Sequence, residues 1–142
     1  MAMLPFCGYN MADYFQHWFN MGSKTSKPPL IFHVNWFRTD KKGDFLWPGY
    51  GENIRVLEWV AQRCAGKGQA CKTPIGYVPA KGALDLSGLD LSEEIIEELL
   101  CVDPRDWLGE TAQLKEFFAK FDDHRLPAEI KTQLDALAQR LK

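Results

Sequence analysis

Apolar residues recur at helical spacing in five stretches of the chain, and each stretch opens with a residue typical of a helix N-terminus. The apolar positions of the first are Met11, Tyr14, Phe15, Trp18 and Phe19. The sequence therefore predicts helices that follow the capping residues Asn10, Asn53, Ser92 and Asp103, and a last helix that begins at Pro127.

The stretch from Leu30 to Trp47 has an extended pattern instead. Residues 30–39 are typical of a strand, and Asp40 and Gly43 suit the first and fourth positions of a turn. Residues 44–47 then return, so we expect a β-hairpin that ends at Pro48. Residues 73–79 are bounded by prolines and predict one short edge strand.

These elements predict an α+β fold, mostly helical with a small β-hairpin or sheet, in one unit that spans residues 1–142. No internal repeat and no linker divides the chain. The apolar opening at residues 1–6 suits the interior of a longer chain.

Aromatic residues are concentrated between Ile31 and Asn53, which include Phe32, Trp36, Phe37, Phe45, Trp47 and Tyr50. Neighbouring side chains of a strand point to opposite faces. Because Trp36 and Phe37 are neighbours, at least one of the two faces away from the core.

Composition and charge narrow the function classes. Hydrophobic residues make up 46% and charged residues 25% of the 142, which is typical of a globular protein. A net charge of -2 gives no general attraction to nucleic acid or to an anionic membrane. No apolar run approaches the ~20 residues of a membrane span, and no signal pattern opens the chain, so we expect a cytoplasmic protein.

The four cysteines show no metal-ligand spacing. Cys7, Cys64, Cys71 and Cys101 form no Cys-x-x-Cys pair and have no histidine at ligand distance. We expect free thiols in a reducing compartment and no zinc site.

Two glycine-containing segments resemble nucleotide loops only superficially. Residues 22–25 read GSKT, but they lack a Gly-Lys pair and follow a helix where a phosphate loop follows a strand. Gly49 and Gly51 would need a third glycine at Ile54 to form a dinucleotide-binding fingerprint.

The aromatic stretch predicts a site for a planar base. Rings at Phe37, Phe45 and Tyr50 come from two arms and the tip of one hairpin, and stacking contributes roughly 1–3 kcal/mol per base. Asn53 offers an acceptor and a donor to a base edge. The backbone N–H groups of Tyr50, Gly51, Glu52 and Asn53 suit guanine O6, whereas adenine presents an amino donor there. An unpaired buried polar group costs about 1–3 kcal/mol, enough to choose between purines.

Other interpretations of the same residues stay open. Hairpin aromatics are most often core, and Asn53 fits a simple helix cap. Trp36 and Trp47 are structural in either case and suit a wall behind the pocket. A non-enzymatic aromatic module for a sugar or peptide, or a structural helical fragment that self-associates, remain alternatives.

The residues also carry a family resemblance. The segments IFHVNWF, FLWPGYGEN, RVLEWV, TPIGYVP and ALDLSGLDL, in this order, resemble the C-terminal part of the GTP-dependent phosphoenolpyruvate carboxykinases. The resemblance implies an enzyme that converts oxaloacetate and GTP to phosphoenolpyruvate, GDP and carbon dioxide with Mn²⁺ or Mg²⁺. It implies that Phe37, Phe45 and Tyr50 enclose guanine and that Asn53 reads its edge. The family commonly has Phe where Tyr50 stands.

The resemblance also implies what lies outside this chain. The phosphate loop, the reactive cysteine, the metal ligands, the substrate arginines and the lid of the family all precede it. We therefore expect no catalytic residue and no metal ligand here, and no catalysis by the isolated chain. The expected partners are a guanine nucleotide and the remainder of the parent enzyme, without nucleic acid or membrane.

Overall fold

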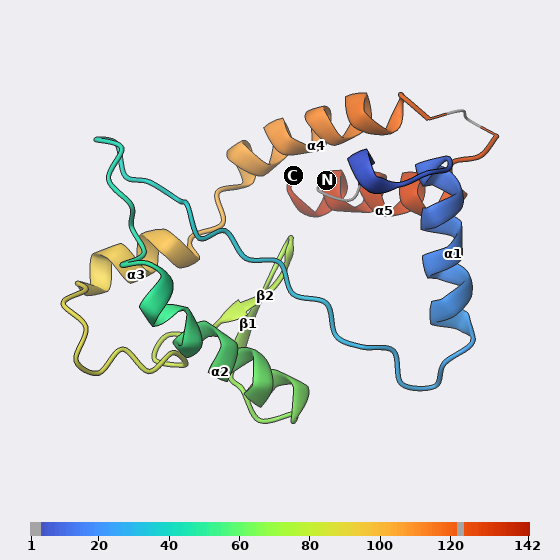
Figure 1. The fold of residues 1–142 in the computed structure, drawn as a ribbon. Coiled ribbons are helices and arrows are strands. Elements are labelled where there is room, and N and C mark those ends of the chain that lie inside the picture. The colour runs from blue at the N-terminus through green and yellow to red at the C-terminus, as the bar shows by residue number, and fades with distance from the viewer. Residues whose placement is uncertain (1–3, 122–123) are drawn as a thin grey trace. The chain divides into compact units, whose positions relative to one another are not determined.

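The computed structural model describes residues 4–121 and 124–142, in which helices predominate (Figure 1). The elements in order are η1 (Leu4–Phe6), α1 (Met11–Ser23), η2 (Tyr50–Glu52), α2 (Asn53–Cys64), β1 (Ala70–Thr73), β2 (Gly76–Pro79), α3 (Glu93–Leu100), α4 (Pro104–Phe118) and α5 (Ala128–Arg140). The predicted α+β class, mostly helical with a small sheet, is confirmed.

All five predicted helices form, and three begin at the predicted side-chain cap. The Asn10 Oδ1 atom accepts a hydrogen bond from the Ala12 N–H at 2.9 Å, and the Ser92 hydroxyl accepts one from the Ile95 N–H. The Asp103 carboxylate accepts one from the Arg105 N–H at 2.8 Å. Such caps satisfy N–H groups that have no partner within the helix, which explains why they could be predicted.

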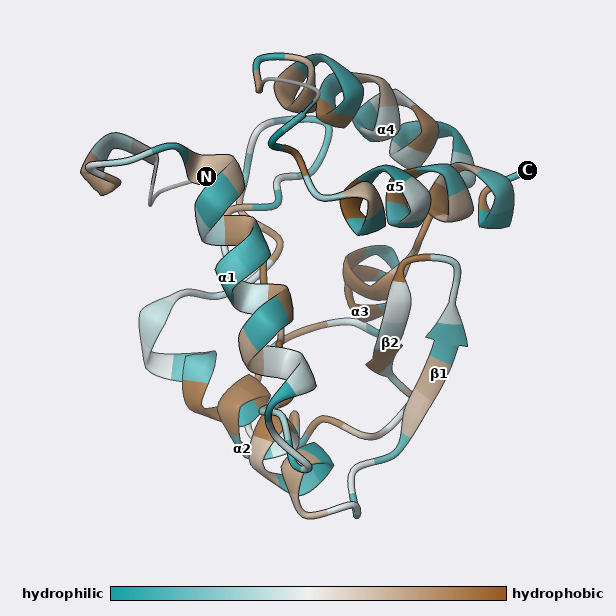
Figure 2. Cartoon of the chain, turned by 90° about the vertical axis from the view of Figure 1, so that its right-hand side faces the viewer, coloured by the Kyte–Doolittle hydropathy of each residue, from teal (hydrophilic) through white to brown (hydrophobic). Residues whose placement is uncertain are grey.

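The chain divides into two compact units, and the first is formed by Met1–Pro29 with Asp103–Lys142. Its buried core contains Met11 and Phe15 of α1 together with Leu126, which precedes α5. The Phe15 ring meets Phe118 and Phe121 edge on, with centroids 6.1 and 5.8 Å apart. Helices α4 and α5 lie side by side, as Figures 1 and 2 both show.

The second unit, Leu30–Val102, holds α2, α3 and the only sheet of the described residues. Strands β1 and β2 pair antiparallel, from Ala70 opposite Pro79 to Thr73 opposite Gly76. The prediction of one edge strand over residues 73–79 is confirmed for β2, Gly76–Pro79, which lies at the edge of this two-stranded sheet. It is wrong for the start of the segment, because Thr73 ends β1 and a tight turn follows. Gly76, at φ 136°, gives the turn a backbone conformation that other residues rarely adopt.

The predicted hairpin over residues 30–47 is also wrong, although its turn is confirmed. Only Thr39 and Phe45 pair, as an isolated bridge. Asn35 explains part of the difference, because its side-chain oxygen accepts the Phe37 N–H at 3.0 Å and so turns the chain where a ladder would run. Asp40 fixes the predicted turn by accepting the N–H groups of Lys42 and Asp44.

Two further expectations are confirmed. Phe37 is 73% exposed, so one of the two neighbouring aromatic residues does face away from the core. Cys7, Cys64, Cys71 and Cys101 are free thiols.

Within residues 4–121 and 124–142, no helix combines the length and the apolar character needed to cross a membrane.

Candidate functional site

The predicted site residues lie on one segment of the second unit, residues 36–53, here called the aromatic tip. Its two arms are joined where the Leu46 N–H donates to the Arg38 carbonyl at 3.0 Å and the Asp40 N–H to the Asp44 carbonyl at 2.9 Å. The Arg38 guanidinium donates to the carbonyls of Leu99 and Cys101 at the end of α3. These bonds position the tip without a continuous sheet.

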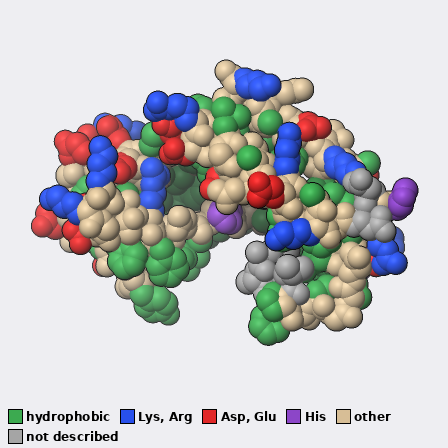
Figure 3. All heavy atoms as spheres, turned by 90° about the horizontal axis from the view of Figure 1, so that it is seen from above, with side chains coloured by type: hydrophobic (Ala, Val, Ile, Leu, Met, Phe, Trp, Pro, Cys, Tyr) green, Lys and Arg blue, Asp and Glu red, His purple; other side chains and the backbone are tan. Residues whose placement is uncertain are grey.

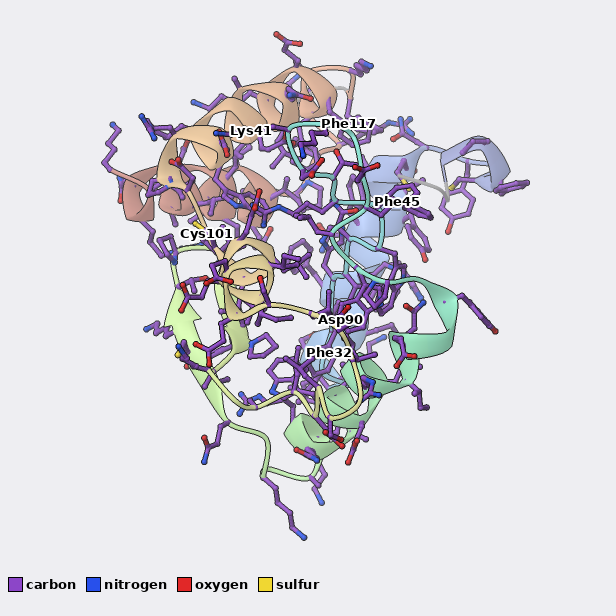
Figure 4. The ribbon with its side chains drawn as sticks, turned by 90° about the vertical axis from the view of Figure 1, so that its left-hand side faces the viewer. Phe32, Lys41, Phe45, Asp90, Cys101 and Phe117 are labelled. Carbon is purple, nitrogen blue, oxygen red and sulfur yellow. The ribbon has the colours of Figure 1, made fainter. Side chains whose placement is uncertain are left out.

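Phe37 and Phe45 contact each other at the surface of the tip (Phe45 is labelled in Figure 4). Their ring centroids are 6.1 Å apart and their planes meet at 61°, an edge-to-face arrangement. Because the rings touch, no base fits between them. The two phenylalanines form a single apolar wall that is 73% and 64% exposed, ready to contact one face of a planar ligand.

Tyr50 stands apart from that pair. Gly49, at φ 115° and ψ -168°, bends the backbone just before the short helix η2, and Tyr50 is its first residue. The Tyr50 side chain is 92% exposed and makes no ring contact with another aromatic residue in the part of the chain that the structure describes. The structure therefore brings together Phe37 and Phe45, but it does not bring Tyr50 against them.

Asn53 is not the cap of α2, contrary to the sequence prediction. It is the first residue of the helix, with helical φ and ψ of -60° and -25°, because η2 has already turned the chain. The cap position falls to Glu52, which forms no side-chain capping bond. The Asn53 Oδ1 atom instead accepts a hydrogen bond from the Trp47 indole Nε1–H at 2.9 Å.

Trp47 and Trp36 lie behind the site residues as an inner layer. Trp47 is only 6% exposed, and its ring centroid lies 6.5 Å from that of the half-buried Trp36. A third tryptophan, Trp59 of α2, meets Phe32 edge on at 6.0 Å (Phe32 is labelled in Figure 4). The hydrogen bond to Asn53 gives Trp47 a polar role that the aromatic pattern alone did not indicate.

The backbone donors of the tip are partly used. The Glu52 N–H donates to the Gly49 carbonyl, and the Asn53 N–H donates to the Tyr50 carbonyl. The N–H groups of Tyr50 and Gly51 meet no acceptor among the described residues. They lie at the N-terminal approach to α2, where the helix dipole favours a partial negative charge.

Glu52 turns its side chain toward α2. Its carboxylate accepts from the Arg55 Nε at 2.6 Å, an ion pair between partly buried side chains. The Arg55 guanidinium also donates to the Asp85 carbonyl at 2.7 Å. Of the predicted site residues, Glu52 is thus the one already engaged by a charged neighbour.

A cavity of about 370 Å³ lies beside α2, and none of the predicted base-binding residues lines it. Four of its lining residues come from α2 and the rest from residues 82–86, and they are Arg55, Glu58, Trp59, Gln62, Gly82, Ala83, Leu84, Asp85 and Leu86. Hydrogen bonds from the Ser87 hydroxyl and N–H hold the pKa of Asp85 below its usual value. The only sequence signal for this cavity is the Asp-x-Ser turn at residues 85–87.

No metal centre accompanies the site in the described residues. No three His, Cys, Asp or Glu side chains among residues 4–121 and 124–142 gather closely enough to hold an ion. The divalent metal that the family resemblance implies therefore finds no fitting ligand set in this part of the chain.

Comparison with known proteins gives one consistent answer. Residues 1–140 match the family described as "Phosphoenolpyruvate carboxykinase C-terminal P-loop domain". Three curated relatives named phosphoenolpyruvate carboxykinase [GTP] align with 99% of this chain, at 56% identity in Neocallimastix frontalis, 50% in Chlamydia abortus and 49% in Arthrobacter sp. (strain FB24). The chain spans 23–24% of the length of these relatives.

Proposed function

Because the chain belongs to the family of the phosphoenolpyruvate carboxykinase C-terminal P-loop domain, we propose that it supplies guanine recognition to a GTP-dependent carboxykinase. The parent enzyme converts oxaloacetate and GTP to phosphoenolpyruvate, GDP and carbon dioxide, a step of gluconeogenesis. Its relatives carry GTP in their names, and the chain aligns with them over nearly its whole length.

The observation that carries the proposal is the pairing of an exposed aromatic wall with a carboxamide at a helix N-terminus. Phe37 and Phe45 present bare rings, and stacking on aromatic rings contributes roughly 1–3 kcal/mol per base. Asn53 lies on the same tip and is partly exposed. The rings hold the base and the amide reads its edge.

The two remaining contacts of the proposed site come from residues 50 and 51. Tyr50 is the most exposed of the three rings and stacks on the second face of the base once a nucleotide arrives. The N–H groups of Tyr50 and Gly51 donate toward guanine O6. Glu52 serves the site indirectly, because its ion pair with Arg55 holds the first turn of α2.

Purine choice follows from the donors at this edge. Guanine carries an acceptor at O6, whereas adenine carries an amino donor at the same position. A donor that faces another donor without water loses its hydrogen bond, which costs about 1–3 kcal/mol. The expected preference for GDP over ADP is therefore about 5- to 150-fold in Kd.

Titration of the purified chain with GDP and with ADP tests this proposal. Trp36 and Trp47 are two of the five tryptophans and lie in the tip, so binding there should change their share of the emission. We expect GDP to change the emission at lower concentration than ADP. Equal responses to both nucleotides would contradict guanine recognition, and a response to a sugar or peptide alone would favour the aromatic module of another class.

The chemistry of the parent enzyme belongs, in this proposal, to the part of the protein that the chain does not span. The relatives are about four times as long as the aligned segment. The parent enzyme uses Mn²⁺ or Mg²⁺, and we assign neither a metal ligand nor a catalytic residue to this chain. Phosphoenolpyruvate formation by the purified chain with oxaloacetate, GTP and Mn²⁺ would overturn this assignment.

A further inference from the structure

Trp47 is the one buried side chain of the aromatic tip that donates a hydrogen bond to a proposed base-reading residue. Its indole Nε1 lies 2.9 Å from the Asn53 Oδ1, and 6% of its surface is exposed. Trp36 lies against the ring of Trp47, with centroids 6.5 Å apart. The indole is therefore held in place on the inner side of Asn53.

The chemistry of the two groups fixes how the Asn53 carboxamide faces. An indole N–H is a donor and never an acceptor. The carboxamide atom that meets it must be the carbonyl oxygen, because the amide nitrogen would oppose one donor with another. The Asn53 Nδ2 group consequently points away from Trp47 and offers only N–H donors.

We propose that Trp47 is a positioning residue that sets the purine preference of the site by locking the Asn53 carboxamide with its donors outward. This inference rests on the proposed function, since it concerns the same base. With the indole N–H in place, Asn53 meets an acceptor such as the 6-keto oxygen of guanine or hypoxanthine. Without it, the carboxamide can rotate by half a turn and present its oxygen to the amino group of adenine.

Trp47 has two separable roles, one for its bicyclic ring and one for its indole N–H. The bicyclic ring fills space behind the tip, and loss of that ring would weaken every nucleotide alike. The N–H selects among nucleotides, and loss of the N–H alone would change their relative affinities. The ratio of affinities for 6-keto and 6-amino purines is therefore the diagnostic quantity.

Isothermal calorimetry of the 142-residue chain with GDP, IDP and ADP measures that ratio independently of tryptophan emission. In the unmodified chain we expect GDP and IDP to bind with similar Kd, because both carry the 6-keto oxygen, and ADP to bind more weakly. In Trp47→Phe, the GDP-to-ADP preference is expected to fall severalfold and to stay above one, because the N–H groups of Tyr50 and Gly51 still donate toward O6.

Two further variants keep the test decisive. Replacement of Trp47 by 3-benzothienylalanine preserves the bicyclic shape and removes only the N–H, so it reports selectivity even if Trp47→Phe fails to fold. Trp18→Phe, on half-exposed Trp18 of α1, is the matched control and should keep the ratio of the unmodified chain. A uniform loss of affinity for all three nucleotides, or an unchanged ratio in the benzothienyl variant, would overturn the positioning role.

The outcomes also distinguish this inference from the proposed function. If the unmodified chain shows no preference for GDP over ADP, guanine recognition itself fails. If it shows the preference and the benzothienyl variant retains it, only the role of Trp47 fails. Nuclear magnetic resonance gives a second readout, because Asn53→Ala should shift the indole N–H proton of Trp47 and leave that of Trp18 in place.

Discussion

The Asn53 carboxamide is the side chain proposed to distinguish guanine from adenine, so its substitution tests the purine preference most directly. Asn53→Ala removes one of the donors proposed to meet O6 and leaves the rings of Phe37 and Phe45 in place. We expect GDP affinity to fall part of the way toward that of ADP, because the N–H groups of Tyr50 and Gly51 remain, while ADP affinity changes little. Fluorescence titration with both nucleotides measures the two constants.

The matched control removes another carboxamide from the same helix. Gln62 is exposed on α2, where its amide donates to Glu58, and it is no part of the aromatic tip. Gln62→Ala should leave both nucleotide constants unchanged. Equal effects of the two alanine substitutions would show that Asn53 acts through the stability of α2 alone.

Tyr50 separates the contribution of a ring from that of its hydroxyl. The ring is 92% exposed. We expect Tyr50→Phe to preserve the affinities for GDP and ADP. Tyr50→Ala should weaken both alike, by roughly 1–3 kcal/mol, because stacking does not distinguish purines. A GDP-specific loss in Tyr50→Ala, measured by the same titrations, would assign edge recognition to this residue.

At the scale of elements, side-chain caps could be predicted from the sequence and the aromatic strands could not. Asn10, Ser92 and Asp103 act within a few residues of themselves, so the local sequence suffices. Asn35 and Asn53 are also of a residue type that caps helices, but the Asn35 side chain forms a turn and the Asn53 side chain accepts a hydrogen bond from Trp47. Both outcomes depend on competing partners that residue spacing does not rank.

The same limit applies to the candidate site. The aromatic density predicted which residues belong to the tip, and the turn at Asp40 placed them on two arms. The contact of Phe37 with Phe45, and the distance of Tyr50 from both, depend on a backbone that forms one bridge instead of a ladder. A periodic pattern carries no information about where such a ladder stops.

Substitution of Gly49 measures how much the backbone bend of the tip depends on glycine for stability. Its φ of 115° with ψ of -168° is almost exclusive to glycine, although a Cβ atom there would meet nothing within 4 Å. Gly49→Ala should therefore lower the free energy of unfolding by about 1–3 kcal/mol through backbone strain alone. Gly51→Ala, two residues on and also unobstructed, should not show that loss. Urea denaturation of both variants makes the comparison, and equal losses would contradict the strain.

Asp103, the N-cap residue of α4, should make the stability of the chain depend on pH in the acidic range. A hydrogen bond from the Arg105 side chain, and a second from its N–H, lower the pKa of Asp103 below its ordinary 3.8. A group with a lowered folded-state pKa stabilises the fold above its unfolded pKa, and that contribution disappears as the pH falls through the folded value. Below pH 3.8, Asp103→Asn, which can still cap the helix, should therefore lose stability less steeply than the unmodified chain. Chemical denaturation across this range measures both slopes, and equal slopes would contradict the role of Asp103.

At the scale of the whole molecule, several large apolar side chains are exposed, as the space-filling view in Figure 3 illustrates among the charges. Phe6 and Ile31 are 83% and 80% exposed, and Leu30 and Met21 about half. Apolar surface of this kind favours association. We expect the isolated chain to self-associate as its concentration rises, and light scattering measures the mass. Ile31→Lys should shift the equilibrium toward monomers, whereas Lys24→Arg should not, and a clean monomer at all concentrations would contradict the prediction.

The discontinuous first unit also fixes an order of events during synthesis. Met11 and Phe15 leave the ribosome long before Leu126, their partner in the core, because all of Leu30–Val102 is made in between. At roughly 5–20 residues per second, that interval lasts several seconds or more. The second unit, which is continuous, can fold during translation. The contacts of Met11 and Phe15 with Leu126 can therefore form only after the second unit has been made.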